Sequence, residues 1–198
     1  MGGRIASESV GGMRRNMHLK DLDRSGVRIG AGAGTWDDLS YFEALAKQTN
    51  LDYIDMHLYP IQRDFLIDRT LRIAKLAQTY GKELSVGEAW LYKAAEKEFR
   101  DLMAVQAKIF SRDVFDLWIP LDEKFIEVMV KLSHHLRMEF CSFFWMRYFY
   151  GYVEYNQTTK NLMPPQLFRQ ANEKAFRNIV SNTLSPTGRT FQRWITEK

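Results

Sequence analysis

The chain has 198 residues, of which 45% are hydrophobic and 26% charged, and its formal net charge is +4. These values are typical of one globular domain with a hydrophobic core. The basic residues are scattered, so nothing predicts nucleic-acid binding. The single cysteine, Cys141, excludes an internal disulfide, and four histidines with one cysteine give no zinc-finger spacing. We expect no metal and no other cofactor.

No apolar stretch reaches the ~20 residues that a membrane helix needs. Residues 1–12 also lack the apolar core of a signal peptide, and their glycines and serines predict a flexible segment. We therefore expect a cytosolic protein without membrane contact, unless the native N-terminus lies further upstream. Residues 13–198 are predicted to form a single domain, beginning with a short helix over 13–23.

The first half of the domain alternates predicted strands and helices. Val27–Gly34 has the small residues of a buried strand, and its glycines indicate close approach by another backbone or a ligand. The next predicted elements are a helix that Ser40 and Glu43 open with a capping-box pattern, a strand over 52–58, an amphipathic helix over 65–80 and a strand over 83–91. Gly81 is a stop signal for the second helix.

The second half continues this alternation with longer connections. Predicted elements are a helix over 94–110, a loop over 111–120, a helix over 123–136 capped by Asp122, an apolar strand over 138–145, an aromatic loop over 148–155 and a helix from Pro164. Residues 185–188 are a predicted turn, after which Phe191 and Trp194 pack the tail. Strands that alternate with helices imply an α/β protein with a parallel sheet. Four such βα units are half of a TIM (β/α)8 barrel, so we expect a half or incomplete barrel.

Polar residues follow two of the predicted strands. His57 and Tyr59 close the strand over 52–58, and Glu88 lies near the end of the strand over 83–91. Asp55 is on the same side of its strand as His57. Because the carboxyl ends of parallel strands meet at one edge, where βα folds hold their active sites, these side chains are predicted to converge there.

These strand ends resemble a known family. The segment 52–60, Glu88-Ala89-Trp90 and Phe143-Phe144-Trp145 are similar to the last three strands of clan A glycoside hydrolases, retaining (β/α)8-barrel enzymes that include family 5 cellulases and mannanases. The resemblance covers roughly residues 27–155 and makes the four strands equivalent to strands five to eight. It implies hydrolysis of O-glycosidic bonds of a carbohydrate, with Glu88 as the nucleophile, His57 and Tyr59 orienting it, and Trp145 as a sugar platform.

Other side chains near these strand ends are candidates for substrate binding. Trp90 and Tyr92 follow Glu88 and are predicted either to wall a subsite or to pack. Trp36 follows the glycine-rich strand and is a weaker subsite candidate, and Asp55 is expected to line the interior. Arg147 is expected to bind a substrate hydroxyl or carboxylate, or to pair with an acidic neighbour.

The chain departs from this family at the second catalytic carboxylate. The family places its acid/base glutamate, usually after Asn, at the end of strand four, which would fall before Met13. Glu8 is the only glutamate there, and no Asn precedes it. The resemblance thus implies a truncated barrel whose acid/base is missing from this chain. A half-barrel exposes strand edges, so we expect a homo-oligomer or binding of a missing N-terminal half.

Two other functions remain open from the sequence. One is a catalytically inactive carbohydrate-binding or scaffold half-barrel that uses the aromatic edge without turnover. The other is a different barrel enzyme in which His57, Glu88 and Asp55 coordinate a divalent metal. The metal alternative is disfavoured, because no further His or acidic residue falls at an adjacent strand end.

Overall fold

A computed structural model of the protein describes residues 26–60, 64–95, 98 and 102–196. The predicted flexible segment 1–12 and the predicted helix over 13–23 lie outside the described residues. None of the described helices combines the length and the apolar composition that crossing a membrane requires.

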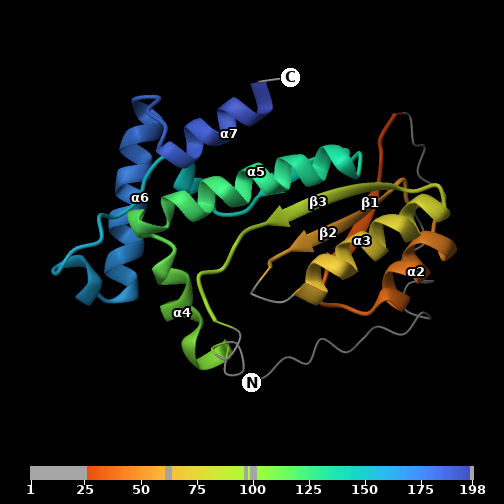
Figure 1. The fold of residues 1–198 in the computed structure, drawn as a ribbon, viewed down its shortest axis with the longest axis horizontal. Helices are drawn as coiled ribbons and strands as arrows, with labels where there is room; N and C mark the ends of the chain where they lie inside the picture. The colour runs from red at the N-terminus through yellow and green to blue at the C-terminus, as the bar shows by residue number, and fades with distance from the viewer. Residues whose placement is uncertain (1–25, 61–63, 96–97, 99–101, 197–198) are drawn as a thin grey trace.

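The centre of the molecule is a four-stranded, all-parallel sheet (Figure 1). Its strands are β1 (Gly30–Gly34), β2 (Tyr53–Leu58), β3 (Glu83–Ala89) and β4 (Cys141–Phe143), in the order β1-β2-β3-β4. The prediction of an α/β protein built from four parallel βα units is confirmed. Strands β1 and β4 are shorter than the predicted strands 27–34 and 138–145.

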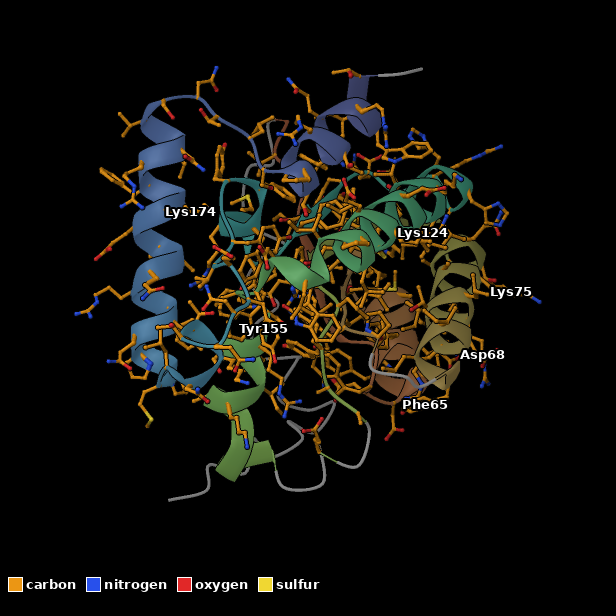
Figure 2. All side chains as sticks on the ribbon, turned by 60° about the vertical axis from the view of Figure 1, so that its left-hand side comes forward. Phe65, Asp68, Lys75, Lys124, Tyr155 and Lys174 are labelled. Carbon is orange, nitrogen blue, oxygen red and sulfur yellow. The ribbon has the colours of Figure 1, made fainter. Side chains whose placement is uncertain are left out.

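Helices cover one face of this sheet. Helix α2 (Leu39–Gln48) packs on β1 and β2, and α3 (Asp64–Thr79) packs on β2 and β3. Helix α5 (Ile119–His135) contacts β4, and α7 (Pro186–Thr196) packs along α5 (Figure 1). The outer surface of this layer is mixed. It carries polar side chains such as Asp68 and Lys75 on α3 and Lys124 on α5, and also exposed apolar ones such as Phe65 on α3 (Figure 2).

The hydrophobic core lies between the sheet and these helices. In β2 the side chains of Ile54, Met56 and Leu58 are fully buried, whereas those of Tyr53, Asp55 and His57 are only partly buried. This alternation follows from the two-residue repeat of a strand. The main contributors from the other elements are Phe42, Leu45, Ile73, Ala77, Val86, Phe125, Ile126, Met129 and Phe143.

Two helices lie apart from this layer. Helix α4 (Leu102–Arg112) and helix α6 (Pro164–Val180) pack against each other on the side to which the strands point (Figure 1). Helix α6 buries only the small stripe of Leu167, Ala171 and Ala175. The apolar side chains at its C-terminal end are open to solvent, with Phe176 68% and Val180 72% exposed.

Several predicted boundaries were wrong, and capping explains most of them. Helix α5 begins at Ile119 with Pro120 in its first turn, so the predicted loop is shorter and Asp122 is no cap. Helix α2 begins after Asp38, which places Ser40 inside the helix and removes the predicted capping box. The predicted turn over 185–188 is the start of α7.

The region before α4 also differs from the prediction. Helix α4 starts at Leu102, not near residue 94, and Ala94 and Ala95 have no regular structure. By contrast, the predicted tail packing is confirmed, since Phe191 stacks on Phe149 with ring centroids 4.7 Å apart. The predicted close backbone approach at the glycine-rich strand is confirmed as well. A Cβ atom on Gly32 would collide with the carbonyl oxygen of Asp55.

Candidate functional site

The carboxyl ends of β2 and β3 bring His57, Tyr59 and Glu88 together, as the sequence predicts. His57 is the register partner of Glu88, and the register shifts between Met56 and His57. The Tyr59 hydroxyl donates a hydrogen bond to Glu88 Oε2 at 2.7 Å. His57 Nδ1 lies 3.5 Å from the same oxygen, and the Glu88 side chain is 38% exposed. The result is a carboxylate that is held by two neighbours and open to solvent.

Tyr59 is suited to hold this carboxylate because its hydroxyl keeps its proton. Burial raises the pKa of Tyr59 well above its ordinary value, and the hydrogen bond to Glu88 raises it further. The hydroxyl is therefore a hydrogen-bond donor throughout the pH range in which proteins stay folded. Both neighbours of Glu88 approach Oε2, so no hydrogen-bond donor within the described parts of the chain reaches Oε1.

Asp55 lies on the other side of His57. Its carboxylate is 3.6 Å from His57 Nε2 and accepts a hydrogen bond from Ser85 Oγ at 2.6 Å. Gly87 makes room for it, since a Cβ atom at that position would collide with the Asp55 carboxylate. The imidazole thus stands between two carboxylates, with one facing each ring nitrogen.

A network of aromatic rings extends from Tyr59, the hydrogen-bond partner of Glu88. We call six of them the aromatic rim: Trp36, Tyr59, Tyr92, Phe110, Phe144 and Trp145. Tyr59 stacks on Tyr92 with centroids 4.9 Å apart, and it also contacts Trp36 and Phe144, each at 6.1 Å. Phe110 links Tyr92 to Trp145, at 5.2 Å and 6.0 Å, and Phe144 lies 4.7 Å from Trp145.

The rim offers both exposed and buried faces. Trp36 is 52% exposed and Phe144 38% exposed, so both present apolar surface next to Tyr59, the hydrogen-bond partner of Glu88. Burial raises the pKa of Tyr92 to about 12, with smaller contributions from Asp113 and Glu88. Flat, partly exposed rings next to a carboxylate are able to stack on the apolar face of a sugar.

Trp145 has an unusual backbone within this rim. Its φ of 59° is in the left-handed region, which costs a bulky residue on the order of 1–3 kcal/mol. Its ring is covered by the Arg147 guanidinium, 4.4 Å from the ring centroid. Arg147 also donates a hydrogen bond to Asn172 Oδ1 at 2.8 Å, which ties it to α6. The predicted acidic partner of Arg147 is thus an amide.

Trp90 does not reach the site surface. Its side chain is fully buried, stacks on Tyr148 at 5.5 Å and meets Phe125 edge to face at 6.1 Å. Of the two alternatives for Trp90, the structure therefore supports packing rather than a subsite wall. His134 and His135 are exposed on α5. Cys141 is a free thiol whose burial raises its pKa to about 12, which makes it a poor nucleophile.

Sequence analysis missed a second polar cluster, which is buried. We call it the buried ionic cluster: Lys93, Asp113, Asp122, Tyr152 and Thr187. The Lys93 ammonium pairs with Asp122 and lies 3.8 Å from Asp113. Tyr152 donates to Asp122 at 2.9 Å and shares a hydrogen bond with Thr187 at 2.7 Å.

Burial governs the electrostatics of this cluster. It raises the pKa of Asp113 to about 7, although the nearby Lys93 acts in the opposite direction. It also raises the pKa of Asp122 above its ordinary value, again against the effect of Lys93. No sequence pattern predicts this cluster, because its five members come from five separate segments of the chain.

The residues proposed as metal ligands do not form a metal site. Within residues 26–60, 64–95, 98 and 102–196, no group of three His, Cys, Asp or Glu side chains is placed to hold an ion. Asp55 and Glu88 face opposite nitrogens of His57, so the three cannot converge on one ion.

Comparison with known proteins gives no relative. No protein-family model, no curated protein and no solved structure matches the chain significantly. The fold alone defines the class of this protein, which is an α/β protein with a four-stranded parallel sheet of βα units.

Proposed function

We propose that the carboxyl edge of the sheet is a carbohydrate site of the retaining glycoside hydrolase type, with Glu88 as its nucleophile. The observation that carries this proposal is the partly exposed Glu88 carboxylate, fixed at 2.7 Å by the hydroxyl of Tyr59, which belongs to the aromatic rim. The resemblance of the strand ends to clan A glycoside hydrolases supports the same assignment.

The chemistry assigns a distinct task to each oxygen of Glu88. Oε2 is held by Tyr59 and faces His57, so Oε1 is the atom proposed to attack the anomeric carbon. The bond from that carbon to the leaving oxygen breaks as a glycosyl ester forms, and the leaving oxygen takes up a proton. Water then hydrolyses the ester and restores the carboxylate. Exposed rings of the rim, Trp36 and Phe144, are proposed to stack on the sugar.

The proton donor is the open part of this mechanism. A retaining enzyme needs a second carboxyl group ~5–5.5 Å from the nucleophile. Within the described residues, Asp55 is linked to Glu88 only through His57, which stands between the two carboxylates. This observation favours a second candidate function, carbohydrate binding at the same rim without turnover.

An activated substrate separates these two candidates. Dinitrophenyl β-glucosides and β-mannosides carry a leaving group that departs without protonation, so Glu88 is expected to react with them even without a proton donor. With a fluoro-sugar version, whose glycosyl ester is slow to hydrolyse, intact-protein mass spectrometry should detect one added glycosyl unit. Peptide mapping should place that unit on Glu88.

Two variants test whether Glu88 is the residue that forms the ester. Glu88→Gln should form no ester, whereas Glu173→Gln, an exposed change on α6, should react like the wild type. Sugar-dependent tryptophan fluorescence without any ester would favour the binding candidate. If neither sugar binding nor ester formation occurs, the proposal of a carbohydrate site is wrong.

A further inference from the structure

The sheet is covered by helices on one side only. Helices α2, α3 and α5 pack on the face that buries Ile54, Met56 and Val86. We call the other face, which carries Tyr53, Asp55 and His57, the helix-free face. No helix of the described residues is packed on it. All-parallel sheets occur almost only with both faces covered, so we expect another protein surface to cover this face.

Large and small residues alternate from strand to strand on the helix-free face. Strand β2 contributes Tyr53, Asp55 and His57, and the rings on either side of β4, Phe140 and Phe144, contact Tyr53 at 5.7 Å and Tyr59 at 6.1 Å. Strand β1 contributes small residues instead, and so does β3 between Glu83 and Glu88, the two large residues near its ends. The small residues are Gly30, Gly32, Gly34, Ser85 and Gly87.

This alternation is the internal pattern of a (β/α)8 barrel. The interior of such a barrel is filled by layers of four side chains, which come from alternate strands. Here Tyr53 and Phe140 lie edge to face as two members of one layer. Four strands thus supply two of the four side chains that each layer needs.

Both edges of the sheet are also open. Within the described residues, β1 pairs only with β2, and β4 pairs only with β3. Open strand edges present unpaired N–H and C=O groups that favour pairing with another strand.

We propose that the helix-free face and both sheet edges are the interface with a second copy of this chain, which closes an eight-stranded barrel. A two-fold axis along the barrel keeps all strands parallel and sets β4 of each copy beside β1 of the other. The alternation then continues without a break, because small-residue β1 follows large-residue β4. Twofold dimers are the commonest symmetric assemblies. This inference concerns the sheet and does not depend on the role of Glu88.

The assembly also changes the surroundings of Glu88. Each copy adds its own strand ends to the same edge, so the rim of the closed barrel carries two Glu88 sites. The exposed rings of Phe140 and Phe144, now 43% and 38% exposed, become covered or border the opening.

A disulfide at the new strand pair tests this arrangement. Cys141 is the only cysteine in the chain, and Ala31 and Ala33 on β1 lie on the helix-covered face, as Cys141 does. In the 198-residue chain, refolding of Ala31→Cys or Ala33→Cys in an oxidising glutathione buffer, where the Cys141 thiol is not yet buried, should cross-link one of the two to Cys141 of the other copy. A disulfide forms when the two Cα atoms are about 4.4–6.8 Å apart. Ser181→Cys, at the exposed end of α6, should give no cross-link.

Light scattering on the unmodified chain gives the second readout. The expected mass is twice 23.3 kDa. Ser142→Arg, which buries a charge on the helix-free face, should raise the dissociation constant at least about tenfold, because an unpaired buried charge is costly. His134→Arg, on the exposed side of α5, should leave it unchanged. A monomer, or a dimer that neither cysteine variant cross-links, would overturn the proposal.

Discussion

Two polar clusters lie close together along the chain, and they differ in their access to solvent. Glu88 near the end of β3 is 38% exposed, whereas the Lys93 side chain, a few residues later, is fully buried. Glu88 has one oxygen held by Tyr59 and one oxygen without a donor among the described residues. Lys93 instead faces two carboxylates in the interior.

This difference in solvent access suits Glu88 to a functional site and the buried ionic cluster to structural support. A carboxylate that solvent and substrate reach is able to do chemistry, while a buried ion pair is enclosed and mainly fixes its surroundings. The buried ionic cluster joins the segment after β3 to α5 and, through Tyr152 and Thr187, to α7. A change in the buried cluster should therefore reduce stability, and a change at Glu88 should reduce function.

Lys93→Met is expected to give the largest effect. It keeps the length of the side chain but leaves Asp113 and Asp122 without their cation. Removing one partner of a buried pair costs about 3–5 kcal/mol of unfolding free energy. Urea denaturation measures this loss. Lys124→Met, an exposed change on α5, is the control and should stay close to the wild type. A loss below about 1 kcal/mol for Lys93→Met would contradict the structural role of the cluster.

Tyr59→Phe should act on function rather than on stability. It removes the hydroxyl that holds Glu88 Oε2, and loss of one such donor lowers a rate about 10²-fold. The rate of ester formation with the dinitrophenyl glycosides measures this effect. The free energy of unfolding should change by only about 1 kcal/mol. Tyr155→Phe, whose side chain is 48% exposed, is the control. An unchanged rate together with a large loss of stability would show that Tyr59 supports the fold and not the chemistry of Glu88.

Asp113→Asn should change the pH dependence of stability. Burial raises the folded-state pKa of Asp113 to about 7, so the folded chain binds this proton more tightly than the unfolded chain. This tighter proton binding adds to the free energy of unfolding. The added stability is complete below the unfolded pKa of about 3.9 and is lost as the pH rises towards 7. The slope is at most about 1.4 kcal/mol per pH unit. Urea denaturation from pH 5 to pH 8 should show this decline in the wild type and a weaker one in Asp113→Asn. Parallel curves would contradict the assignment.

The sequence predicts the sheet well because each strand carries a strong local signal. The strand over 52–58 and the helix over 65–80 combine apolar periodicity with a clear stop, at Pro60 and Gly81 respectively, and both are present. Helix starts are predicted less well. Ser185 accepts a hydrogen bond from the Gly188 N–H at 3.1 Å, and Pro186 follows it. A serine before a proline opens a helix as readily as it makes a turn.

The sequence predicts only the part of the site that lies at the ends of the strands. His57, Tyr59 and Glu88 close neighbouring parallel strands, so the topology alone brings them together. The position of Trp90 was not decidable, because a tryptophan just beyond a strand end fits both a subsite and the core. The buried ionic cluster was beyond sequence reasoning, since Asp122 in a first helical turn has the pattern of a cap. Its pairing with Lys93 follows from tertiary packing.

The central claim is that Glu88 is the reactive carboxylate of a carbohydrate site. The most direct measurement is the mass of the protein after incubation with the fluoro-sugar dinitrophenyl glycosides, followed by peptide mapping. We predict one added glycosyl unit on Glu88, its absence in Glu88→Gln and its retention in Glu173→Gln. An unmodified wild-type protein, or a glycosyl unit on another residue, would contradict the claim.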